Sequence, residues 1–216
     1  MHLVVFGAGG NVGQHIVSEA LSRQHRVTAA VRDEATILPQ HNLDVVEADA
    51  TDPTSVAQVS SGADAIVSAI SPRPGQDGRP ASSLSTAANA LTEGARRAGV
   101  RRLIIVGGAG SLELAPGQQL VDQPDFPEAY KPEALAQRDA LAIYRGGSAH
   151  DLDWTYISPA AEVRPGRRTG AYRVSGDQLL TNDAGESTIS FEDFAVAVLD
   201  QIEQHAHVGE RISVAN

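Results

Sequence analysis

The sequence predicts an α/β fold: a doubly wound, mostly parallel sheet with helices on both faces. Short apolar runs, such as residues 3–6 and 102–106, alternate with segments of helical periodicity, such as residues 11–23. The first apolar run also ends in a glycine-rich turn from which the first predicted helix begins. Strands separated by helices pair in parallel, because each connecting helix crosses over the sheet.

The remaining elements continue the alternation. Further strands are predicted over residues 26–31, 43–48, 63–70, 152–157 and 211–214, and further helices from Asp52-Pro53 onward and over 80–98, 128–145 and 191–204. Residues 107–128 are rich in glycine and proline and predict a long loop. Tyr172 and Val174 alternate with polar residues, so we expect a small hairpin excursion on the substrate side of the sheet over roughly 160–190. We expect residues 1–216 to form one domain.

The composition narrows the function classes. The 216 residues are 42% hydrophobic and carry a net charge of -10, so the chain can bury a core and is unsuited to nucleic acid or anionic membranes. The absence of cysteine excludes disulfides and thiolate chemistry, and the scattered histidines suggest no metal site. The N-terminal residues are predicted to be a first strand and not a signal peptide, so we expect a cytoplasmic protein. A monomer and a homodimer both remain open.

The glycine-rich turn is the strongest functional signal. The segment GAGGNVG places Gly7, Gly10 and Gly13 three residues apart. One glycine permits a sharp exit from the strand, another lets the backbone approach a pyrophosphate, and the third lets the helix lie close to the strand. The helix that begins near Asn11 directs its N-terminal amides at the phosphates. This turn predicts a Rossmann-type site for a nicotinamide dinucleotide.

The end of the second predicted strand favours NADP(H), although NAD(H) is possible. Arg32 stands at the strand end, where an arginine can bind the 2′-phosphate of NADP through two hydrogen bonds. Asp33 follows it, and an acid at this place favours the 2′-hydroxyl of NAD. A solvated surface role for Arg32 remains the alternative. Asp49, after the third strand, can accept a hydrogen bond from the adenine amino group or serve only in the turn.

Together these motifs resemble the atypical short-chain dehydrogenase/reductases. The similarity is greatest to the NADH-flavin reductase branch, which is related to biliverdin reductase B and the NmrA-like proteins. The resemblance covers nearly the whole chain. It lies in VVFGAGGNVG, DATD, VRRLIIVGGAGSLEL, LDWTYISPA, PGRRTGAYRV and GESTISFEDFAVAVLDQIE.

The resemblance implies a set of cofactor contacts along the carboxyl edge of the sheet. The pyrophosphate would lie against the turn, the 2′-phosphate at Arg32, the adenine beside Asp49 and Ala50, the ribose beside the fourth strand, and the nicotinamide near the sixth. The residues so implied are Gly7, Gly10, Asn11, Val12, Gly13, Arg32, Asp49, Ala50, Ala69, Ile70, Ser71, Ser158, Pro159 and Ala160.

One departure from the larger family affects the chemistry. Most short-chain dehydrogenases carry a Tyr-x-x-x-Lys pair, in which the lysine lowers the tyrosine pKa for proton transfer. Here Lys131 is the only lysine, and Pro127 stands four residues before it. The pair is therefore absent, which disfavours alcohol oxidation that depends on a tyrosine acid.

Hydride transfer to a flavin, quinone or similar planar acceptor, such as a small carbonyl, needs little acid-base help. We therefore predict an NAD(P)H-dependent reductase of such an acceptor. Ser111 in the long loop and the Tyr130-Lys131 pair are the candidate catalytic residues, and a loop-cap or helix-start role is the alternative for each. Two other functions stay open. One is a non-catalytic redox sensor of the NmrA-like type, and the other is an epimerase- or dehydratase-like enzyme.

Overall fold

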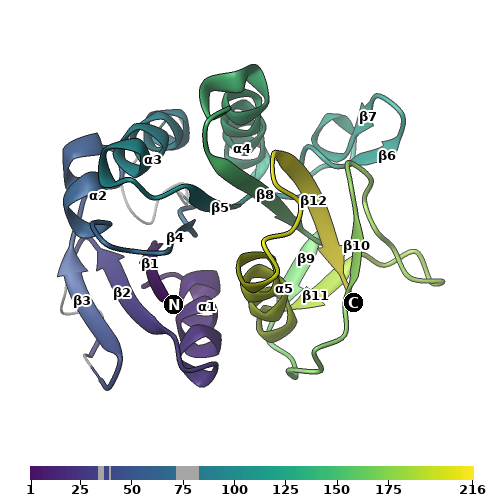
Figure 1. Ribbon diagram of the computed structural model, residues 1–216. Coiled ribbons are helices and arrows are strands. Elements are labelled where there is room, and N and C mark those ends of the chain that lie inside the picture. The colour runs from purple at the N-terminus through teal and green to yellow at the C-terminus, as the bar shows by residue number, and fades with distance from the viewer. Residues whose placement is uncertain (34–36, 39, 72–82) are drawn as a thin grey trace.

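The core of the molecule is an eight-stranded sheet in the order β10-β12-β8-β5-β4-β1-β2-β3 (Figure 1). The computed structural model describes residues 1–33, 37–38, 40–71 and 83–216. Seven strands are mutually parallel: β1 (His2–Phe6), β2 (Arg26–Val31), β3 (Leu43–Glu47), β4 (Ala65–Ser68), β5 (Arg102–Val106), β8 (Asp153–Pro159) and β12 (Glu210–Ala215). The predicted parallel α/β class is confirmed.

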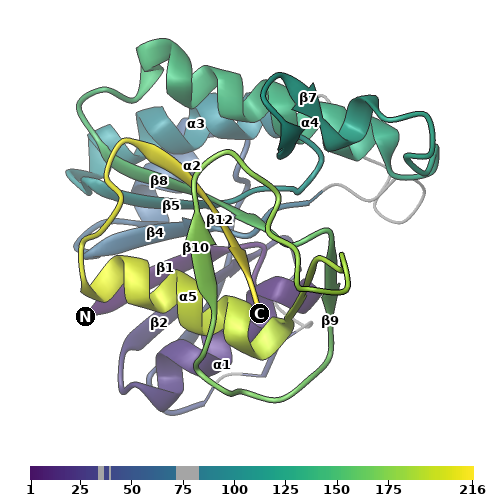
Figure 2. The ribbon, with the colours of Figure 1, turned by 90° about the vertical axis from the view of Figure 1, so that its right-hand side faces the viewer.

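Helices cover both faces of this sheet (Figure 2). On one face lie α1 (Asn11–Ser22) and α5 (Phe191–Glu203); on the other lie α2 (Pro53–Val59), α3 (Ser83–Ala98) and α4 (Lys131–Ile143). Each face has its own hydrophobic cluster, and the central strands contribute side chains alternately to the two. This is why the central strands are continuous apolar runs.

The helix boundaries follow local capping chemistry. The Asp52 carboxylate accepts a hydrogen bond from the Thr54 amide at 2.9 Å, and Pro53 begins α2. The first residues of the helix predicted from residue 80 lie outside the described part of the chain, and α3 is described from Ser83. The predicted long loop after β5 contains a two-stranded antiparallel pair, β6 (Glu113–Ala115) and β7 (Gln118–Gln119).

The hairpin expected over 160–190 does not form, so that prediction was wrong. The strand that contains Val174, β10 (Arg173–Ser175), pairs antiparallel with β12 at the edge of the main sheet. A second pair forms in parallel between β9 (Glu162–Arg164) and β11 (Thr188–Ser190). The alternation of residues 172–174 indicates a strand but cannot identify its partner, which lies about forty residues further along the chain.

Asp193 anchors this excursion to the start of α5. Its side chain is 1% exposed. Its carboxylate accepts hydrogen bonds from Thr169 N and Gly170 N at 2.8 Å, from Thr169 Oγ1 at 2.6 Å and from Asn216 Nδ2 at 2.9 Å. Burial acts to raise the pKa of Asp193, but these donors outweigh it, and the net effect is a lowered pKa.

We expect Asp193→Ala to lower the free energy of unfolding substantially, because each buried donor left unsatisfied costs about 1–3 kcal/mol. Since the pKa of Asp193 is lower in the folded state, its contribution is present near neutral pH and is lost as the pH falls through that pKa. Urea titrations at pH 7 and at acid pH measure both effects. Asp183→Ala, an exposed carboxylate in the same excursion, is the control. Equal stability of the two variants would contradict this account.

Candidate functional site

A cavity of about 680 Å³ opens at the carboxyl ends of the parallel strands. Its lining includes the ends of β1, β2, β5 and β8 and the residues that follow β3 and β4. The strand order reverses beside β1, since the chain continues to β2 on one side and later returns to β4 on the other. A crevice at such a switch point is where open α/β sheets bind ligands, and the volume suits a large organic molecule.

The three glycines of the first turn have three different geometric roles. Gly7 has φ +77°, and a Cβ there would lie 2.5 Å from the Ala69 carbonyl oxygen. A Cβ on Gly13 would lie 2.1 Å from the Gly7 carbonyl oxygen, so this glycine allows α1 to pack onto the turn. Gly10 lines the cavity and has an extended backbone, with φ −79° and ψ 163°. At Gly7 and Gly10 the backbone of the turn therefore faces the cavity without a side chain.

The first turn of α1 offers backbone donors. Gln14 N is the first amide to bond back into the helix, at 2.9 Å from the Gly10 carbonyl oxygen. The N–H groups of Asn11, Val12 and Gly13 have no acceptor among the described residues, and no side chain caps the helix at Gly10. Unpaired amides at the positive end of a helix dipole form an anion site. A pyrophosphate fits this cradle.

Ten of the predicted cofactor residues line the cavity, where they come from five different segments. They are Gly7, Gly10, Asn11, Val12, Arg32, Ala50, Ala69, Ile70, Ser71 and Pro159. Arg32 and Asp33 both line it at the end of β2. The cavity thus extends from this charged corner to the apolar ends of β5 and β8.

The other four predicted cofactor residues lie behind the lining. Gly13 packs against the turn, and Ala160 is buried in a hydrophobic cluster. Ser158 is buried and accepts a hydrogen bond at 3.3 Å from Arg211. Asp49 Oδ1 accepts hydrogen bonds from Thr51 N and Oγ1 at 2.9 and 2.7 Å, as turn chemistry requires. A cofactor in the cavity could therefore contact these four residues only through their backbone atoms or after their side chains rearrange.

The three candidate catalytic residues also lie outside the lining. Ser111 is buried, and its carbonyl oxygen accepts a hydrogen bond from Arg211 at 3.2 Å. Tyr130 is 65% exposed, and Lys131 forms an ion pair with Glu128 at 3.2 Å on the surface at the start of α4. Catalytic roles for the three stay predictions, and the described geometry gives them no direct contact with the cavity.

Two polar residues of α4, Glu133 and Gln137, line the cavity and were not singled out from the sequence. They lie four residues apart, which places both on one face of the helix. Ser71 Oγ donates a hydrogen bond to the Glu133 carboxylate and so joins the end of β4 to α4. Gly107 and Gly108, after β5, complete this wall. The i, i+4 spacing of two polar residues was the available signal, but it is equally typical of a solvated helix face.

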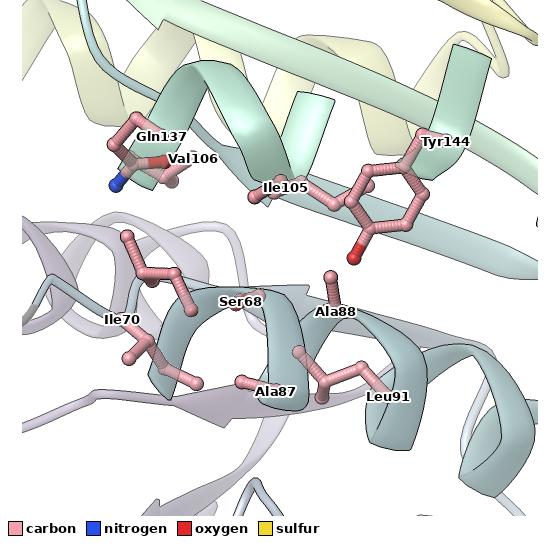
Figure 3. A pocket seen from close by; sticks show the side chains of 11 residues that line it. Ser68, Ile70, Ala87, Ala88, Leu91, Ile105, Val106, Gln137 and Tyr144 are labelled. Atoms are coloured by element: carbon pink, nitrogen blue, oxygen red, sulfur yellow. The ribbon is translucent and has the colours of Figure 1, made fainter. Parts of the chain in front are cut away.

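Behind this wall, a second cavity of about 10 Å³ lies between α3, α4 and the sheet. Ile70, Val106 and Gln137 line both cavities. Figure 3 shows the Tyr144 hydroxyl directed into the smaller one, and among the described residues it has no hydrogen-bond partner. The space suits one water molecule, which would satisfy this buried hydroxyl.

The sheet, the glycine turn and the anion cradle define a Rossmann-type protein. The chain belongs to the NAD(P)H-binding family, which it matches over residues 7–205. This confirms the dinucleotide-binding Rossmann family that the motifs predicted.

Three solved structures are similar over nearly the full length of both chains. A Burkholderia pseudomallei protein, provisionally named an exported protein, is 42% identical with a TM-score of 0.89 and 100% of each chain covered. A provisionally named epimerase from Bacteroides thetaiotaomicron is 36% identical, with a TM-score of 0.88 and coverage of 99% of this chain and 96% of that one. A provisionally named NADH-flavin reductase from Streptococcus pneumoniae is 34% identical, with a TM-score of 0.85 and coverage of 100% and 99%.

The family match establishes a nicotinamide dinucleotide-binding fold, and the differing names of the neighbours leave the reaction and its acceptor open. No helix in the described ranges is long and apolar enough to span a membrane.

Proposed function

We propose that this protein is an NADPH-dependent reductase that transfers a hydride to a flavin, a quinone or a similar small planar acceptor. The observation that carries the proposal is the one cavity that connects the amide cradle of α1, Arg32 just after β2 and the apolar ends of β5 and β8. The family match supports the cofactor class, and the Streptococcus pneumoniae neighbour supports the acceptor class.

In this proposal the chain supplies binding, orientation and exclusion of water. The α1 amides hold the pyrophosphate, Arg32 holds the 2′-phosphate, and Ala50 lies against the adenine. Ala69, Ile70 and Ser71 border the ribose, and Pro159 borders the nicotinamide. The bound dinucleotide supplies the hydride. Apolar side chains such as Val106 and Ile70 keep that end of the cavity dry, which favours a reaction that needs little proton transfer.

The test is NADPH oxidation, followed at its absorbance maximum, against a panel of free flavins, quinones and small carbonyls. We expect turnover with at least one planar acceptor and none with alcohols or nucleotide sugars. NADPH binding without turnover on any acceptor would favour the redox-sensor function. Conversion of a nucleotide sugar would favour the epimerase-like function, which the name of the Bacteroides thetaiotaomicron neighbour also suggests.

Lys131→Met should change NADPH binding and acceptor reduction by no more than about twofold, because an exposed ion pair contributes little. In the described geometry its ammonium pairs with Glu128 and does not line the cavity. Steady-state kinetics of the variant decide the matter. A loss of about 100- to 10,000-fold, the typical contribution of a positioned general acid, would show that Lys131 reaches the reacting groups.

We propose a cytoplasmic protein that acts on a small molecule, as a monomer or a homodimer, without nucleic-acid or membrane partners. The acidic net charge of -10 supports the last point. The name of the Burkholderia pseudomallei neighbour is an independent reason to test the location, by fractionation of cells that express the chain at its natural level.

A further inference from the structure

Gln137 is a buried amide in the wall of the large cavity. It is 6% exposed and stands in the middle of α4. Polar side chains this deeply buried are expected to form hydrogen bonds. Gln137 therefore either serves the protein structure alone or has a partner that enters from the cavity.

Tyr156 on β8 fixes the orientation of this amide. Its hydroxyl donates toward Gln137 Oε1 at 2.8 Å and toward the Gln137 backbone oxygen at 2.9 Å. Burial raises the pKa of Tyr156, so the hydroxyl remains a proton donor at any ordinary pH. The ring is also held in place by Gly107, where a Cβ would lie only 1.9 Å from it. Tyr156 thus occupies the oxygen of the amide and leaves its nitrogen on the other side.

The amide nitrogen has no partner among the described residues. Nε2 carries two N–H donors, and it forms no hydrogen bond with an acceptor in the described part of the chain. In Figure 3 this nitrogen points toward the side on which Ile70 lies, at the end of β4. An oriented but unpaired donor at a cavity wall is suited to a ligand acceptor atom.

The neighbours of Gln137 show which part of a ligand it would meet. Gln137 shares its wall with Val106, Gly107 and Gly108 at the end of β5. Arg32, at the end of β2, lies three strands away in the sheet order, since β4 and β1 separate β5 from β2. A dinucleotide with its 2′-phosphate at Arg32 and its pyrophosphate at the glycine turn would extend its other half toward Gln137.

We propose that the Gln137 amide is a fixed hydrogen-bond donor to the nicotinamide half of the dinucleotide, and that Tyr156 is the residue that positions it. This inference rests on the proposed cofactor function. The acceptor atom is an oxygen of the nicotinamide carboxamide or of its ribose, the two groups in that half that carry lone pairs near the reacting ring.

The experiment compares two ligands by calorimetry: NADPH and adenosine 2′,5′-bisphosphate, which lacks the nicotinamide half. Gln137→Met should weaken NADPH binding about tenfold, the value expected for one lost neutral hydrogen bond, and leave the bisphosphate unchanged. Gln137→Glu, which keeps the shape but presents only acceptors, should also weaken NADPH alone. Gln118→Met, an exposed glutamine on β7, is the control and should bind both ligands as wild type does.

Tyr156→Phe should cause a smaller loss for NADPH than Gln137→Met and none for the bisphosphate, because the amide remains present but is no longer held. Thermal unfolding of each variant checks that the fold is retained. Wild-type NADPH affinity in Gln137→Met, or equal losses for both ligands, would overturn the inference and leave the cofactor function standing. Failure of wild type to bind either ligand would overturn both.

Discussion

Gly10→Val is expected to reduce NADPH affinity by at least about 100-fold and to change the thermal unfolding midpoint only slightly, since the lost contacts are several charge-assisted hydrogen bonds of about 1.5–3 kcal/mol each. Gly10 has φ −79° and ψ 163°, an extended backbone that valine adopts readily. Its Cβ would meet Gly7 O at 3.3 Å, a tight contact, and the branched side chain would stand in the cavity in front of the α1 amides.

A second glycine variant separates loss of binding from loss of stability. A Cβ on Gly94 would lie 2.4 Å from the Val56 side chain, in the packing of α3 against α2. Gly94→Ala should therefore lower the unfolding midpoint and leave NADPH affinity nearly unchanged at a temperature where it is folded. The reverse pattern, with Gly10→Val unstable and Gly94→Ala unable to bind, would show that the amide cradle is not the phosphate site.

Arg32→Ala is expected to weaken NADPH binding by roughly 10- to 100-fold, because a bidentate contact between a guanidinium and a phosphate contributes about 1.5–3 kcal/mol. NADH binding should barely change, since NADH carries no 2′-phosphate. Titrations of both cofactors into the variant measure the two effects separately.

The control for this variant is Arg26→Ala. Arg26 is the first residue of β2, at the other end of that strand from Arg32, and it pairs with Asp44 at 2.8 Å. The Arg26→Ala variant should bind both cofactors as the wild-type protein does. Equal losses for NADPH and NADH in Arg32→Ala would mean that Arg32 does not recognise the 2′-phosphate, and a preference for NADH in wild type would favour Asp33 as the group that reads the ribose.

The parts of the fold that could be predicted are those whose signal is local. Buried strands are continuous apolar runs, and β1, β2 and β5 lie within a residue or so of their predicted bounds. The helix that follows Asp52-Pro53 was predictable because its cap is contiguous in sequence. The glycine turn was predictable for the same reason: all of its geometric requirements fall within seven residues.

The parts that could not be predicted depend on partners distant in sequence. Val174 indicates a strand, but nothing near it in the sequence indicates that this strand pairs with β12. The hairpin prediction was wrong for this reason. The orientation of Gln137 depends on a hydroxyl nineteen residues away in sequence, on β8. Within β8, only Pro159 of the three predicted contacts lines the cavity, while Ser158 and Ala160 are buried. One position along a strand reverses the face of a side chain, and the resemblance alone does not resolve that difference.

The catalytic candidates show the same limitation. Tyr130 and Lys131 are candidates because they stand at the start of the helix that can close over the site, and in the described geometry they precede the cavity-facing part of α4 by only a few residues. The residues of that helix that do line the cavity, Glu133 and Gln137, are of types that are common on any helix surface. Only the packing of α4 beside β5 distinguishes them.

The most direct test of the central claim, that the cavity beside the glycine turn binds a nicotinamide dinucleotide, is a calorimetric titration of NADPH into the wild-type protein. We expect one molecule per chain with a dissociation constant in the micromolar range or below. At about 100 times that concentration, binding should stabilise the folded state by about 2.7 kcal/mol, visible as a rise in the unfolding midpoint. No heat of binding and no shift in that midpoint with millimolar NADPH or NADH would contradict the claim.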